Sequence, residues 1–115
     1  MPDAPFSVPD EVELLEFFGA EPVERSIEEG YWCYELVDAR NVKLRFSFNI
    51  FEQSVQTTLG VAESSLITVV HEGARSMKIA GPLLTCRFSY AGSAATMLLR
   101  IADSISLEWS SLRAT

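Results

Sequence analysis

Few side chains in this 115-residue sequence have the type and spacing that catalysis requires. His71 is the only histidine, and to act as a base or to activate a nucleophile it would need a carboxylate or hydroxyl within hydrogen-bond reach. Glu72 follows it, but adjacent residues of a strand point to opposite faces. The sequence therefore favours a surface or rim histidine without a catalytic role.

Two adjacent acids and two cysteines complete the chemical candidates. Glu28 and Glu29 could act as paired carboxylates, but they match no motif, so solvated loop acids are the favoured interpretation. Cys33 and Cys86 lack a CxxC spacing or a neighbouring histidine, which predicts free buried thiols, with a cross-strand disulfide as the alternative for an exported chain. Nucleotide-binding, zinc-protease, serine-hydrolase and calcium-loop motifs are absent. We expect a non-enzymatic protein with no cofactor and no metal.

Negative charge is concentrated near the N-terminus. The net charge is −7, and residues 1–30 contain nine acids against one base, Arg25, whereas the remaining residues contain eight bases and seven acids. Such a field disfavours nucleic acid and anionic membranes and favours a cationic protein partner, although a solvated helix face is the commoner origin of an acidic segment. The candidate partner-binding residues are the acids Glu11, Glu13, Glu16, Glu28 and Glu29.

Aromatic and basic residues form two further sets within the predicted strands. Most of the aromatic residues are expected in the core, but a curved sheet capped by a helix can leave a pocket for a small apolar ligand. We predict Tyr31, Phe51 and Tyr90 as its partly exposed lining. A second set alternates with apolar neighbours and so could share the outward face of the sheet: Lys43, Arg45, Lys78, Arg87 and Arg100. The favoured role of such basic residues is solubility and edge protection, and the alternative is a surface that binds an anion or a partner.

The segment from Tyr31 to Leu59 has the longest period-two pattern and should be the centre of the sheet. A three-residue loop ending in a left-handed Asn41 places Leu36 opposite Leu44, and Glu35 opposite Arg45. The same register pairs Tyr34 with Phe46 and Trp32 with Phe48. Apolar side chains then meet on one face and opposite charges on the other, which predicts a hairpin of defined register.

A helix is predicted before this hairpin. Ser7 is the expected N-cap, Val8, Val12, Leu15 and Phe18 form an apolar stripe, and Gly19 suits the C-terminal cap, so about three turns are expected. Residues 1–6 should be loosely ordered.

Short strands are predicted after the hairpin. Gly73 suits a tight turn that would join residues 66–71 to 76–80, with Val70 paired with Met77. Residues 94–112 also approximate a helical stripe, although the alternation of Ile105, Leu107 and Trp109 favours strands.

These elements predict a single α+β domain over residues 1–115. An N-terminal amphipathic helix would pack on a mostly antiparallel meander of about seven strands, curled into a half-barrel or sandwich in one variant. No motif identifies a family, but in size, acidity, lack of catalytic motifs and layout the chain resembles small bacterial toxin-neutralising immunity proteins. The resemblance implies a non-enzymatic binding module.

The expected function is therefore an acidic protein-interaction surface that neutralises a cationic partner, and the alternative is a carrier of small apolar ligands with an aromatic pocket between helix and sheet. Without a signal-peptide pattern or a long apolar run, we expect a cytoplasmic location, with no membrane or nucleic-acid partner. The two free edges of an open meander would also permit a homodimer through the sheet edges.

Overall fold

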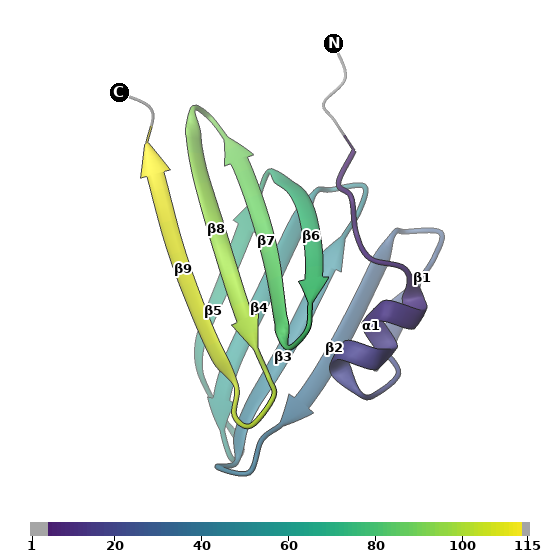
Figure 1. Cartoon of the computed structure of the whole chain (residues 1–115), viewed down its shortest axis with the longest axis vertical. Helices are drawn as coiled ribbons and strands as arrows, with labels where there is room; N and C mark the ends of the chain where they lie inside the picture. Colours follow the sequence, from purple (N-terminus) through teal and green to yellow (C-terminus); the bar gives the residue numbers. More distant parts are fainter. Residues whose placement is uncertain (1–4, 114–115) are drawn as a thin grey trace.

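The computed structural model describes residues 5–113, which form one short helix and nine strands in two antiparallel sheets (Figure 1). The elements are α1 (Glu11–Phe18), β1 (Glu24–Ser26), β2 (Tyr31–Val37), β3 (Val42–Asn49), β4 (Ser54–Val61), β5 (Ser64–Glu72), β6 (Ala74–Ala80), β7 (Leu83–Tyr90), β8 (Ser93–Arg100) and β9 (Ser106–Arg113). Strands make up most of the described residues, and the helix has only eight. The fold is nearly all-β, so the predicted α+β class is wrong.

Both sheets are meanders, since neighbouring strands also follow one another in the sequence. The first has the order β1-β2-β3-β4-β5 and the second the order β6-β7-β8-β9. The prediction of a single meander of about seven strands is therefore wrong, because the chain leaves one sheet and starts the other at Gly73. Gly73 has φ +76°, and a Cβ there would lie 2.5 Å from the carbonyl oxygen of Ser89. Glycine is needed at this crossing both for its backbone conformation and for the close approach.

The predicted hairpin between residues 66–71 and 76–80 does not form. Val70 pairs with Gln56 in the first sheet, and Met77 pairs with Cys86 in the second. A period-two pattern shows which side chains share a face but not which strand lies alongside, so it allowed the wrong partner.

The central hairpin was predicted correctly. Leu36 pairs with Leu44 and Glu35 with Arg45, and the other two predicted pairs, Tyr34 with Phe46 and Trp32 with Phe48, also form. Asn41 has φ 66°, the left-handed conformation expected of it. Residues 94–112 lie in β8, β9 and the turn between them, as the alternation predicted.

The helix is shorter than predicted and begins later. Asp10 is its N-cap, accepting a hydrogen bond from the N–H of Glu13, and Gly19 ends it in the left-handed conformation. Ser7 cannot cap it, because its N–H donates to the carbonyl of Arg75 and its own carbonyl accepts from Met77 at the edge of β6. Val12 of the predicted stripe is exposed. Helix α1 is therefore not the predicted amphipathic helix lying across a sheet face.

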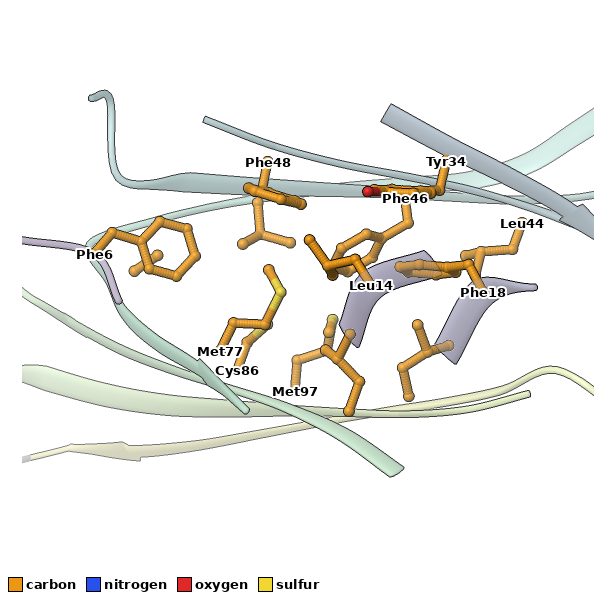
Figure 2. Close-up of a cluster of buried hydrophobic side chains, with 14 of the residues drawn as sticks. Phe6, Leu14, Phe18, Tyr34, Leu44, Phe46, Phe48, Met77, Cys86 and Met97 are labelled. Atoms are coloured by element: carbon orange, nitrogen blue, oxygen red, sulfur yellow. The ribbon is translucent and has the colours of Figure 1, made fainter. Parts of the chain in front are cut away.

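The core lies between the two sheets, and α1 closes it on one side. Figure 2 shows Leu14 and Phe18 of α1 between side chains of the first sheet, such as Phe46, and side chains of the second, such as Met97. Figure 1 shows α1 beside β2, where the second sheet ends at β6. Phe6 is also buried in the core, which corrects the expected loose N-terminus at that residue, while residues 1–4 lie outside the described part of the chain.

Candidate functional site

The five predicted partner-binding acids lie at the β1 side of the first sheet. Glu11, Glu13 and Glu16 are on α1, whereas Glu28 and Glu29 are in the turn between β1 and β2, and all five are exposed. We call these five residues the acidic edge. Figure 1 shows α1, β1 and the β1–β2 turn on the same side of the molecule, so the fold places the two groups of acids on one side.

Two of these acids already have internal roles. Glu11 lies 3.2 Å from the guanidinium of Arg25, an ion pair that connects α1 to β1. Glu13 completes the capping box of α1, because its carboxylate accepts from the N–H of Asp10 at 3.3 Å. Both carboxylates contribute to the local structure as well as to the surface charge.

The other three acids carry negative charge that no described basic side chain, from residue 5 to residue 110, neutralises by an ion pair: Glu16, Glu28 and Glu29. The backbone of Glu29 is nevertheless fixed, because its N–H donates to Ser26 Oγ and its carbonyl accepts from Asn49 Nδ2. A turn with a fixed backbone and free carboxylates can present charge to a partner at a small cost in entropy.

Arg45 does not neutralise the acidic edge, because it pairs with two other acids. Its guanidinium donates to the carboxylates of Glu24 at 2.7 Å and Glu35 at 2.5 Å, and these hydrogen bonds, the one to Glu24 above all, raise the pKa of Arg45. The excess charge of the N-terminal segment therefore remains on the exposed acids around it.

The predicted ligand-binding aromatics do not line a common pocket. Phe51 is exposed in the β3–β4 turn and packs over Gly30, Tyr31 is half-buried on β2, and Tyr90 is exposed at the end of β7. A hollow of about 390 Å³ lies at the C-terminal end of α1, but its lining, which includes Phe17, contains none of the three. Of the three aromatic residues, only Tyr90 lines a second hollow of about 590 Å³, whose lining also includes His71.

The five basic residues do not share one face either. Lys43 and Arg45 belong to the first sheet, whereas the other three, Lys78, Arg87 and Arg100, belong to the second. A basic face shared by all five residues does not form, because the strands that carry them belong to two sheets.

His71 is held by aromatic rings. Its ring centroid lies 4.3 Å from that of Phe88 and 4.8 Å from that of Trp109, and burial lowers its pKa. No group of three or more His, Cys, Asp and Glu side chains among the described residues could hold a metal ion. The histidine packs β5 against the second sheet.

Both cysteines are free and buried, as predicted, and burial raises the pKa of each thiol.

One surface was missed by the sequence analysis. Strand β5 exposes three large apolar side chains, with exposed fractions of 68% for Leu66, 54% for Ile67 and 59% for Val70. The signal in the sequence was the run of apolar residues without charges between residues 64 and 70. Because this strand was expected to pair with residues 76–80, it was not recognised as an edge strand. No helix among the described residues has the length and apolarity to span a membrane.

Comparison with known proteins gives one structural likeness. No family of known sequences and no curated protein matches the chain. A chain of the solved structure "Contact-dependent growth inhibition toxin - immunity protein complex from Klebsiella pneumoniae 342" is similar to it with a TM-score of 0.82 and 23% sequence identity, over 92% of this chain and 96% of that chain. The two chains share the two-sheet fold.

Proposed function

We propose that this chain is a non-enzymatic, immunity-like protein of the cytoplasm, which neutralises a cationic toxin by binding it. The observation that carries the proposal is the shared fold with a chain of a toxin–immunity complex, which extends over nearly the whole length of both chains. A fold alone does not assign a function, so the assignment also needs the properties of the surface.

The surface favours the immunity side of such a complex over the toxin side. Among the described residues, the thiols are buried, and His71, although partly exposed in the hollow of about 590 Å³, contacts the rings of Phe88 and Trp109 and belongs to no cluster of three or more His, Cys, Asp and Glu side chains. A toxin that acts as an enzyme needs a cluster of reactive groups at an accessible site, whereas an immunity protein needs a surface complementary to its target.

Within the acidic edge, three residues should contribute most to binding: Glu16, Glu28 and Glu29. Among the described side chains no ion pair involves their carboxylates, so none has to break when a cationic group approaches. Glu11 would have to share its charge with Arg25, and Glu13 with the helix cap. A charge that is already compensated gains less from a new opposite charge.

The test uses the protein encoded by the gene adjacent to this one. Expressed alone in a bacterial host, that protein should arrest growth, and co-expression of this chain should restore it. Calorimetry of the two purified proteins should then give an affinity that falls as salt is raised, because exposed charges are screened. If the adjacent protein does not inhibit growth, or is not bound by this chain, the proposal is wrong.

A charge-reversal variant tests the surface itself. The triple variant Glu16→Lys/Glu28→Lys/Glu29→Lys should weaken binding at low salt by roughly tenfold or more, mainly through slower association. The matched control reverses three exposed acids outside the acidic edge: Glu63, Asp103 and Glu108. Equal losses in both variants would show that only the net charge matters and would refute the acidic edge as the binding surface.

A further inference from the structure

The edges of the two sheets are protected unequally. Strand β1 is only three residues long, and Ser7 occupies the edge of β6 through two backbone hydrogen bonds. Strand β9 carries the exposed Glu108. Strand β5 has nine residues, pairs with β4 alone among the described strands, and forms the other edge of the first sheet.

Apart from a bulge at Leu66, strand β5 lacks the charges, prolines and covering segments that normally block an edge. Residues 64–70 contain no charged residue and no proline, and Glu72 is the only acid of the strand. Natural proteins usually protect long edges with charges, prolines or a covering segment, because every second residue of an edge strand directs unpaired N–H and C=O groups outward. Here the side chains beside those groups are the exposed Leu66, Ile67 and Val70.

We propose that two copies of this chain pair antiparallel through β5, about a two-fold axis at Thr68, to form a continuous ten-stranded sheet. In this register Leu66 of each copy faces Val70 of the other, and Ile67 faces Val69. Thr68 faces its counterpart, and Glu72 faces Ser64.

The register is self-complementary in both polarity and charge. Apolar cross-strand pairs stabilise a sheet, and like charges directly opposite each other would destabilise it. No like charges meet in this arrangement, and the exposed apolar side chains cover one another. The β4–β5 register shifts at Leu59/Gly60, so Leu66 lies at the bulge and the strand is regular from Ile67 to Glu72.

A second copy fits this edge better than the cationic partner proposed above. The edge has no negative charge between Ser64 and His71 that would select a basic surface. The acidic edge lies on the opposite side of the same sheet, at β1, and stays exposed in the dimer. The dimer proposal therefore does not depend on the proposed function.

The mass of the full chain in solution tests the proposal. Analytical ultracentrifugation at protein concentrations from about 1 to about 100 µM, which covers micromolar dissociation constants, should show a dimer. The variant Leu66→Lys/Val70→Lys should be a monomer over the same range. Its folding should be preserved because both side chains are exposed, which circular dichroism checks. The matched control Ile27→Lys/Val37→Lys also replaces two exposed apolar residues and should remain dimeric.

A cross-link tests the register. Residues directly opposite each other in an antiparallel pair have Cα atoms about 4.5 to 5.5 Å apart, within the range of a disulfide. Mild oxidation should therefore join two copies of Thr68→Cys, whereas Lys78→Cys, at an exposed position of the second sheet, should stay monomeric under denaturing conditions.

Three results would overturn the proposal: a wild-type protein that is monomeric at about 100 µM, a dimer that survives Leu66→Lys/Val70→Lys, or cross-linking of Thr68→Cys no greater than that of the control. If the wild type is monomeric and Leu66→Lys/Val70→Lys abolishes binding of the adjacent-gene protein, β5 is a docking edge for that protein instead.

Discussion

Phe18 connects the helix to the core, and its removal gives the most direct test of this fold. It is the last residue of α1 and only 4% exposed. Its ring stacks on Tyr34 with centroids 4.4 Å apart and lies 5.5 Å from the ring of Phe46 (Figure 2). The side chain therefore fills the space between the sheets beside β2, where β6 ends the second sheet.

Phe18→Ala should lower the free energy of unfolding by about 3 to 5 kcal/mol, the cost of losing a buried aromatic ring and leaving a cavity. Two rings would lose their packing partner, and the helix backbone limits how far the site can collapse. For a domain of this size the loss corresponds to a fall in melting temperature of roughly 10 °C or more. Val12→Ala is the matched control, because Val12 lies on the same helix but is 63% exposed, and it should cost less than about 0.5 kcal/mol.

Urea unfolding followed by tryptophan fluorescence measures both variants. Trp32 stacks on Phe48 in the first sheet and Trp109 stacks on His71 beside the second, so the two fluorophores report on different parts of the core. A loss below about 1 kcal/mol for Phe18→Ala, or equal losses for both variants, would refute the argument that α1 closes the sandwich. It would also remove the reason for expecting Glu11, Glu13 and Glu16 to be held in place by the core.

Two further predictions concern groups inside the fold. The Asp38 carboxylate accepts hydrogen bonds from the N–H groups of Ile105 at 2.9 Å and Val42 at 3.0 Å, and these, with Ile105 first, hold its pKa below the usual range. Because the folded pKa is depressed, the stabilisation is present above the unfolded pKa of about 4 and is lost as the pH falls through the folded pKa. Asp38→Asn should therefore melt below the wild type at pH 7 by a margin that narrows under acid conditions, and a constant margin would contradict this cause. The thiols of Cys33 and Cys86 should both resist a thiol-specific reagent at pH 8 in the native protein and react in urea. The reason is that both thiols are buried and have raised pKa values. Rapid labelling of the native protein would contradict this prediction, because it would show that one thiol is accessible.

The hairpin and the sandwich show what single-sequence reasoning can reach. The register of β2 on β3 could be predicted because two independent signals agree on it: apolar residues meet on one face, and Glu35 meets Arg45 on the other. The division into two sheets had no such local signal. The strand before Gly73 could pair with the strand after it or lie in a separate sheet. The choice depends on residues distant in sequence, such as Phe88 and Trp109, which hold His71 against the second sheet.

The same limit applies to the candidate site. The sequence located the acids but not their partners, and the structure shows that Glu11 and Glu13 are partly used by Arg25 and the helix cap. The capping residue was misplaced because the backbone of Ser7 is bound to β6, a contact across nearly seventy residues. Local rules identify what a residue can do, while distant contacts decide which of these roles remain available.

The two proposed surfaces should act independently because they lie at opposite ends of one sheet. Strands β1 and β5 are separated by four strand spacings, or roughly 19 Å, since neighbouring strands lie about 4.8 Å apart. This separation exceeds the Debye length of about 8 Å at physiological ionic strength, so charge at the acidic edge has little influence on β5. In a dimer paired through β5, the two β1 strands would occupy the far ends of the ten-stranded sheet, roughly 43 Å apart by the same spacing. Each acidic edge would then be free to bind its own partner, and removing the dimer contact should leave the affinity for a cationic protein unchanged.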